Sequence, residues 1–382
     1  MTKSSPQKAN VIKRLYFLTK GGYNEEKSGG KGAFFMQHEI TEKQKLLDKN
    51  GNIANPGFAK RLLWEYDRKD IKAPKWRIKE WDYYYIGNQD YGLCLTIADA
   101  GFVASHSVSI LGFGEKTFQY NGSEMGAFPL GKVGMPRTSE FGDVSVKQGK
   151  LEMEFKNDGV IRVLRGKYED YCKTGKDLVF DVKLTRIPEE SMVIATPFDK
   201  DKHFYYNQKI NCMAAEGYFE FDGKRYDFSE ENGAMATLDW GRGVWTYDNT
   251  WLWGSGQMYL ENGDRFGFNI GYGFGNTSAA SENMLFYNGT SHKLEDVTFN
   301  IPQNEKGEYL YMEPWTFTSS DGRFEMTFEP VIDRCPPADF GIIAMLPHQV
   351  FGKMSGKAVL DDGKIIEIKD RMVFAERVHN KW

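Results

Sequence analysis

Residue types that can bind a small molecule and transfer protons gather between residues 239 and 256. Four of the nine tryptophans lie in this segment, between glycines, Arg242 and two aspartates. A carboxylic acid can donate or accept a proton in a reaction, and an indole face attracts a cation. We therefore predict a ligand platform here. The alternative is a core in which the indoles pack against small residues.

A second cluster follows directly along the chain. After Asn262-Gly263, a strand-like run from 264 to 275 places Gly267, Asn269 and Gly271 on one face. Small side chains on one strand face are typical of close packing or of an open cavity wall. Glu282 then interrupts a small and apolar stretch. It is predicted to be an acid whose pKa is raised in a pocket, or else a solvated loop residue.

These clusters define a predicted site. The predicted catalytic residues are Asp239, Glu282 and Asp248. The predicted substrate-binding residues are Trp240, Arg242, Trp245, Trp251, Trp253, Asn269, Tyr272, Asn283 and His203. One acid would protonate an alkene or a glycosidic oxygen, while aromatic faces would stabilise the resulting cation. Water addition, elimination and glycoside hydrolysis by a carboxylate pair all fit this chemistry.

The function expected from these residues is that of an acid/base enzyme, of hydratase, lyase or glycosidase type. It would act on a small apolar or sugar-like molecule in an aromatic-lined barrel cavity. Two alternatives stay open: a lipocalin-like binding protein without catalysis, and a structural module whose barrels are filled by side chains. Motifs of other enzyme classes are missing. The sequence contains neither H-E-x-x-H nor G-x-S-x-G, and no G-x-G-x-x-G follows a predicted strand. We therefore expect no metal and no cofactor.

The predicted site must be positioned by β-strands, because apolar and polar residues alternate with a period of two after residue 70. Residues 160–163, 179–185 and 219–221 alternate or nearly alternate between apolar and polar. Five Asp-Gly or Asn-Gly pairs separate strand-like runs, at 158–159, 222–223, 262–263, 321–322 and 362–363. Such pairs favour tight hairpin turns. The pattern predicts an all-β antiparallel meander that forms two lipocalin-like, calycin-type barrels or half-barrels, with short helices near 41–49 and 57–66.

Charge and composition limit the kinds of partner that we expect for this protein. The net charge is −4, without the basic excess typical of nucleic-acid binders. No apolar run is long enough to span a bilayer and no secretory signal is visible, so a cytoplasmic protein is expected. Residues 1–35 are predicted to be a flexible basic extension. The charged break at 188–206 suggests a boundary between domains at 36–200 and 201–382. The oligomeric state stays open.

Four runs in this region resemble a bacterial family catalogued as domain of unknown function 2804. They are Asp239-Trp240-Gly241-Arg242-Gly243-Val244-Trp245, Phe266 to Gly275, Ser281-Glu282-Asn283 and the closing Phe374-Ala375-Glu376. The likeness extends from about residue 37 to the end. The broader architecture is similar to two-domain lipocalin-like proteins that include carotenoid hydratases. The resemblance implies two β-barrel domains, and it assigns no catalytic residue to this chain.

Overall fold

The computed structural model describes residues 37–335, 338–339 and 344–381. The basic extension predicted for residues 1–35 lies outside this part of the chain. Within it, the only helices are three single turns of 3-10 helix, η1 (Arg68–Asp70), η2 (Lys75–Arg77) and η3 (Tyr171–Lys173). No helix in these ranges has the length and apolar character that crossing a bilayer requires. The predicted all-β class is confirmed.

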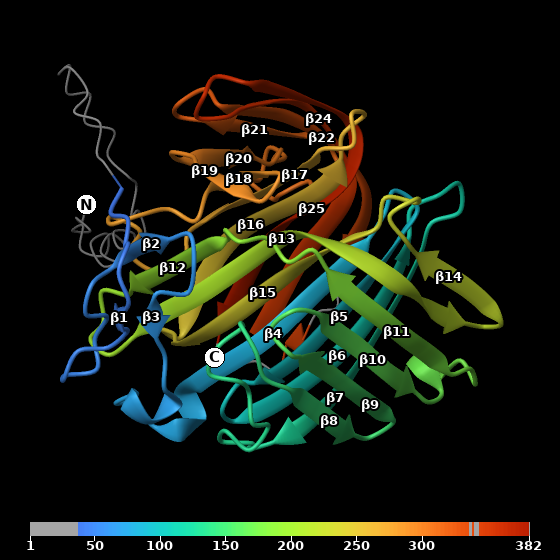
Figure 1. The fold of residues 1–382 in the computed structure, drawn as a ribbon. Helices are drawn as coiled ribbons and strands as arrows, with labels where there is room; N and C mark the ends of the chain where they lie inside the picture. Colours follow the sequence, from blue (N-terminus) through green and yellow to red (C-terminus); the bar gives the residue numbers. More distant parts are fainter. Residues whose placement is uncertain (1–36, 336–337, 340–343, 382) are drawn as a thin grey trace, which may run out of the picture. The chain divides into compact units, whose positions relative to one another are not determined.

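A 13-stranded sheet forms the first barrel-like unit (Figure 1). Its strands are β2 (Gly57–Ala59), β4 (Ile78–Gly87), β5 (Tyr91–Asp99), β6 (Val103–Gly112), β7 (Phe118–Ala127), β8 (Val144–Gln148), β9 (Leu151–Asn157), β10 (Arg162–Tyr168), β11 (Leu178–Thr185), β12 (Met192–Pro197), β13 (Phe204–Phe221), β14 (Lys224–Phe228) and β15 (Met235–Val244). The main path runs β7-β6-β5-β4-β15-β13-β11-β10-β9-β8. The sheet nearly closes, because the Lys150 N–H beside β9 donates to Glu124 Oε1 of β7 at 3.3 Å.

A 10-stranded sheet forms the second unit, a half-barrel, with the main path β19-β18-β17-β16-β25-β24-β22-β21-β20. Its strands are β16 (Asp248–Tyr259), β17 (Arg265–Tyr272), β18 (Met284–Tyr287), β19 (Thr290–Lys293), β20 (Val297–Asn300), β21 (Trp315–Ser319), β22 (Phe324–Arg334), β23 (Ala338–Asp339), β24 (Ala344–Val359) and β25 (Ile365–Lys381). Both sheets pair their described strands antiparallel. The short β1 (Gln44–Lys45) and β3 (Trp64–Glu65) form a separate parallel pair.

All five predicted turn pairs connect neighbouring antiparallel strands. The tightest is the two-residue turn between β13 and β14. There Asp222 and Gly223 adopt φ values of 53° and 70°. A hairpin turn of this kind needs positive φ at both central positions, which Asp tolerates and Gly adopts freely. The turn residues therefore predicted the strand connections correctly.

The two predicted short helices are wrong. Residues 41–49 contain β1, and residues 57–66 contain β2 and β3. Phe58 pairs with Ile194 of β12, so its segment extends the edge of the first sheet. The apolar residues in 58–66 have helical spacing, but the segment is extended. Strand pairing and the burial of Phe58, Ala59 and Trp64 stabilise the extended chain more than a helix would be stabilised.

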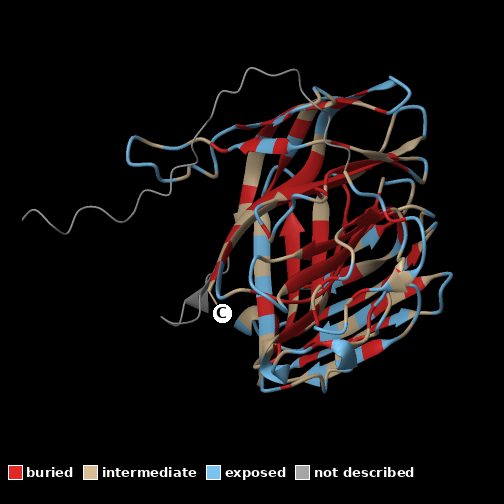
Figure 2. Ribbon diagram, turned by 90° about the vertical axis from the view of Figure 1, so that its left-hand side faces the viewer, coloured by how far each residue is buried: buried red, intermediate tan, exposed pale blue. Residues whose placement is uncertain are grey.

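Buried residues run along the strands of both sheets (Figure 2). Leu95, Val108 and Leu238 belong to the core of the first sheet, whereas Phe268 and Trp315 belong to that of the second. Two further apolar clusters contain residues of both sheets. The outer face of the first sheet therefore packs against a face of the second.

The predicted division at residues 200 and 201 falls between β12 and β13, which pair in one sheet. The chain passes from the first sheet to the second between β15 and β16, at residues 245–247. The division into domains at 36–200 and 201–382 stays a prediction.

Candidate active site

A cavity of about 580 Å³ lies between the two sheets. Strands β4, β5, β6, β7, β13 and β15 line it from the first sheet, and β16, β22, β24 and β25 line it from the second. We had expected a cavity inside a barrel. The interior of the first barrel is instead packed with apolar side chains, and the hollow lies on its outer face.

Strand register brings the polar lining residues into rows. On the first sheet, Tyr83, Asp239 and Lys209 are cross-strand partners in β4, β15 and β13. On the second sheet, Glu376 of β25 is the partner of Trp253 in β16 and of Gln349 in β24. Directly paired side chains share one face of a sheet. All six face the cavity, so the two rows oppose each other across it.

Asp239 and Lys209 form an ion pair in the cavity wall. Lys209 Nζ lies 2.9 Å from Asp239 Oδ1, and the Lys209 side chain is only 3% exposed. Two further donors fix the carboxylate: Asn207 Nδ2 donates to Oδ1 at 2.6 Å, and Trp81 Nε1 donates to Oδ2 at 3.1 Å. Lys209 Nζ also lies 3.9 Å from the centre of the Trp253 ring. Asp239 is thus held as a fully hydrogen-bonded carboxylate.

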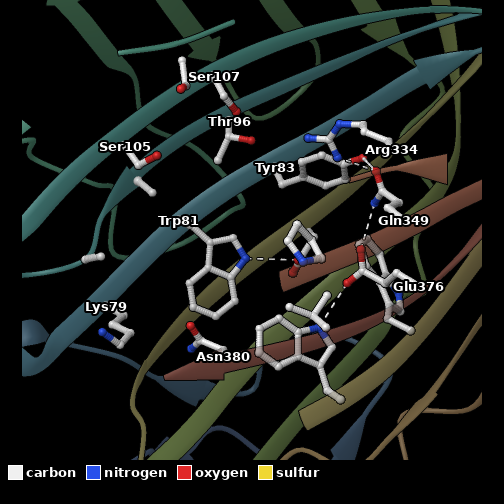
Figure 3. Close-up of a pocket in the computed structure, with 18 of the residues that line it drawn as sticks. Lys79, Trp81, Tyr83, Thr96, Ser105, Ser107, Arg334, Gln349, Glu376 and Asn380 are labelled. Carbon is white, nitrogen blue, oxygen red and sulfur yellow. Dashed lines mark hydrogen bonds between the residues drawn. The ribbon is translucent and has the colours of Figure 1, made fainter. Parts of the chain in front are cut away.

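Glu376 is a buried carboxyl of the cavity lining, and Figure 3 shows it close to Gln349. Burial raises its pKa from 4.5 to about 7, against a smaller lowering by the Trp251 hydrogen bond and by Lys209. Trp251 Nε1 donates to Oε1 and Gln349 Nε2 donates to Oε2, both at 3.0 Å. A carboxyl with a pKa near neutral pH is suited to giving a proton to a ligand and taking one back.

Glu282 supplies a third carboxyl from the segment that precedes β18. Burial raises its pKa, while Lys209 and a hydrogen bond from Asn269 lower it. Asn269 Nδ2 donates to the Glu282 backbone oxygen at 2.8 Å and approaches Oε2 at 3.4 Å. Asn269 Oδ1 in turn accepts from Trp253 Nε1 at 2.7 Å. Asn269 therefore orients both an acid and an indole of the lining without lining the cavity itself.

Aromatic side chains form one end of the cavity. Trp81 stacks on Tyr205 with ring centres 6.2 Å apart. Trp245 meets Trp81 edge-on at 5.2 Å and Trp251 at 6.0 Å. Phe274 closes the group, with its ring 4.9 Å from that of Trp245. The indoles pack against one another and still line the hollow, so the platform and core interpretations each describe part of this cluster.

The structure brings five predicted site residues into the cavity lining. These are Asp239, Glu282, Trp245, Trp251 and Trp253.

The other predicted residues do not line the cavity. Trp240 and Arg242 point into the first barrel, because side chains alternate along β15 and Asp239 faces the other way. Asp248 begins β16 at the surface, with its side chain 55% exposed and paired with His379 at 2.8 Å.

The remaining three serve local structure. Tyr272 packs on Phe299 in the second sheet. Asn283 holds backbone groups, as its Oδ1 accepts from the Gly271 N–H at 2.8 Å. His203 Nδ1 lies 2.8 Å from the Asp201 backbone oxygen in the turn before β13.

Sequence reasoning missed Glu376, Lys209, Gln349 and Arg334. A signal was present for the first two. Lys209 belongs to the alternating row 205, 207, 209 and 211 of β13, where polar residues are buried beside apolar neighbours. Glu376 interrupts the apolar run 372–375. Gln349 and Arg334 carry no comparable pattern, because only strand pairing brings them to the cavity.

The comparison with family models identifies the class of this all-β chain. The model of the domain of unknown function (DUF2804) matches residues 37–382. The chain belongs to this family, as the resemblance of its motifs implied. No curated protein sequence matches it significantly.

The comparison with solved structures finds two proteins that are similar to this chain over most of its length. A candidate AttH from Nitrosomonas europaea is 12% identical, with a TM-score of 0.47 over 82% of this chain and 96% of that chain. Kievitone hydratase from Nectria haematococca is 13% identical, with a TM-score of 0.47 over 89% of this chain and 98% of that chain.

Proposed function

We propose that this protein is an acid/base enzyme that adds water to, or removes water from, a small, largely apolar molecule held between the two sheets. The observation that carries the proposal is the carboxyl of Glu376. It lines an aromatic cavity, its pKa is raised to about 7, and it faces a second carboxylate, Asp239, that is paired with Lys209. Two carboxyl groups whose environments differ in this way are suited to opposite roles as acid and base.

In the hydration direction, the Glu376 O–H gives its proton to one alkene carbon, and the π electrons form the new C–H bond. The neighbouring carbon becomes cationic. The faces of Trp81 and Trp251 stabilise this cation through their ring quadrupoles. A water oxygen then bonds to the cationic carbon and loses its proton to a cavity carboxylate, Asp239 or ionised Glu376. Elimination of water is the reverse sequence: the carboxyl that holds the water proton, Asp239 or Glu376, protonates the leaving hydroxyl, and ionised Glu376 then takes the proton from the C–H bond as the alkene forms.

Tyr205 and Glu282 support this proposal as further polar groups of the cavity lining. Burial raises the pKa of the Tyr205 hydroxyl well above 10, so that it stays protonated and can donate a hydrogen bond. Glu282, whose pKa burial also raises, is a second candidate acid. The same set could protonate a glycosidic oxygen, and the products distinguish that reaction from hydration.

The alternative is a binding protein that uses the aromatic wall without chemistry. It shares the cavity but does not need a proton donor. The experiment that separates the two incubates purified protein with a small-molecule extract in ¹⁸O-labelled water and follows the products by mass spectrometry. We expect metabolites that gain or lose one water in the presence of wild type, and none with Glu376→Gln. Asp248→Asn, at a surface carboxylate, is the matched control and should act like wild type.

If Glu376→Gln and Glu282→Gln both convert the same metabolites as fast as wild type, the assignment fails. If wild type retains a compound without converting it, the binding protein is the correct description. A product cleaved into two parts, with labelled oxygen in the sugar, would identify the glycosidase reaction.

A further inference from the structure

Arg334, at the end of β22, lines the cavity with a guanidinium that is hydrogen-bonded to neutral groups. Nη1 donates to Gln349 Oε1 at 2.6 Å and Nε donates to Ser109 Oγ at 3.2 Å. Among residues 37–335 and 346–381, whose side chains the structure describes, Nη2 finds no acceptor and Arg334 forms no ion pair. Arg334 is also one of the residues that line the cavity. Figure 3 shows it beside Tyr83 and Gln349.

A comparison with Arg242 indicates that, within the described part of the chain, Arg334 lacks a carboxylate partner of the kind that Arg242 has. Arg242, which is fully buried inside the first barrel, lies 3.0 Å from Asp82 Oδ1. A guanidinium removed from bulk water is costly unless an anion and hydrogen-bond acceptors compensate it. Its planar N–H fork fits a carboxylate with two parallel hydrogen bonds. Arg334 has the oriented fork, fixed from two sides by neutral groups, but the acceptor must come from a ligand.

The surroundings of Arg334 favour a polar head group. Across β5, β6 and β7, Thr96, Ser107 and Ser123 are direct cross-strand partners, and all three line the cavity. The next row of β6 and β7 adds Ser109 and Asn121. Hydroxyls and amides at this wall can bind the outer oxygens of an anion. The aromatic group around Trp81 and Trp245 occupies another part of the same cavity. The two regions together fit an amphiphile.

We propose that Arg334 binds the carboxylate of the substrate, which is therefore an apolar carboxylic acid whose hydrocarbon part lies against the aromatic wall. In calling this ligand the substrate, the inference rests on the proposed function. Gln349 connects the two sites: its Oε1 accepts from Arg334, and its Nε2 donates to Glu376 Oε2 at 3.0 Å. The head group and the acid are thus held at opposite ends of one carboxamide. This places the reacting carbons within a few bonds of the carboxylate.

The test compares decanoate with decanamide, which has a neutral head group of nearly the same shape. Binding is followed by tryptophan fluorescence at pH 7.5. We expect wild type to bind decanoate at least about tenfold more tightly, since hydrogen bonds to charged groups are the stronger ones. Arg334→Gln should lose this preference while still binding decanamide. Arg377 lies in β25 outside the cavity lining. Arg377→Gln is therefore the matched control and should keep the preference for decanoate.

Equal affinities in wild type, no binding of either probe, or a preference retained in Arg334→Gln would each overturn the inference. If Arg334→Gln does not fold, as judged by its thermal unfolding, Arg334→Lys replaces it and should bind decanoate more weakly than wild type. Binding needs no turnover, so Glu376→Gln should still prefer decanoate. Loss of turnover in Glu376→Gln without any decanoate preference in wild type would keep the proposed function and remove only this substrate class.

Discussion

Replacing Glu376 by Gln should change how the stability of the protein depends on pH. The folded protein raises the pKa of this carboxyl from 4.5 to about 7. Below pH 4.5 the group is protonated in both the folded and the unfolded chain, and its contribution to stability is fully present. Between pH 4.5 and 7 the unfolded chain releases this proton first, so wild type loses stability as the pH rises. Gln has no proton to release and should escape this loss.

The size of the effect follows from the shift. At ~1.4 kcal/mol per pH unit, the change from 4.5 to about 7 corresponds to a loss of about 3 kcal/mol. The Glu376 residue is only 8% exposed, so solvent screening removes little of it. Each variant is compared with itself at two pH values, so the hydrogen bond that Gln cannot accept from Trp251 or Gln349 largely cancels.

The assay is urea unfolding at pH 4.5 and pH 8, with the free energy of unfolding extrapolated to water. Relative to wild type, Glu376→Gln should gain about 3 kcal/mol between the two pH values. Glu367→Gln, at an exposed position of the same strand, should follow wild type. An identical pH dependence of wild type and Glu376→Gln would refute the reasoning, since the carboxyl would then titrate alike in the folded and unfolded chain.

Two more predictions concern the groups beside this acid. Lys209→Met leaves Asp239 in the cavity wall without its cation and should lower the free energy of unfolding by about 3–5 kcal/mol. In urea unfolding, the double variant Lys209→Met with Asp239→Asn should recover most of that loss. A double variant as unstable as the single one would contradict the pairing. In wild type, the hydrogen bond from Trp251 Nε1 lowers the pKa of the Glu376 carboxyl, and Trp251→Phe removes this donor. Its pKa in this variant should therefore rise above about 7 in a pH titration, and an unchanged or lower midpoint would show that the hydrogen bond is not made.

Local signals were sufficient to predict the fold class but not the packing of the two sheets. Asp222-Gly223 and the other turn pairs act within a few residues, and a period of two specifies a strand by itself. The segment around Phe58 was misjudged because its helical spacing competes with pairing to Ile194, more than a hundred positions away. No sequence pattern states that the outer face of the first barrel is covered by another sheet.

The same distinction explains the site. Asp239 and Trp251 stood out because they lie in a cluster that is unusual along the chain. Trp240 and Arg242 share that cluster but face the opposite side of β15, so clustering in sequence could not separate them. Glu376 comes from the last strand and meets Trp251 across 125 residues. A site assembled by long-range strand pairing is visible from sequence only where its residues are neighbours.

Infrared difference spectroscopy of the ionisation of Glu376 tests the central claim most directly, because it detects the carboxylic acid itself. Spectra are taken from acid to alkaline pH on wild type and on Glu376→Gln. The account predicts a protonated-carboxyl band that disappears with a midpoint of about 7 in wild type and is absent from the variant. The same band in both proteins, or a wild-type midpoint near the ordinary value of 4.5, would contradict it and leave the cavity without its proton donor.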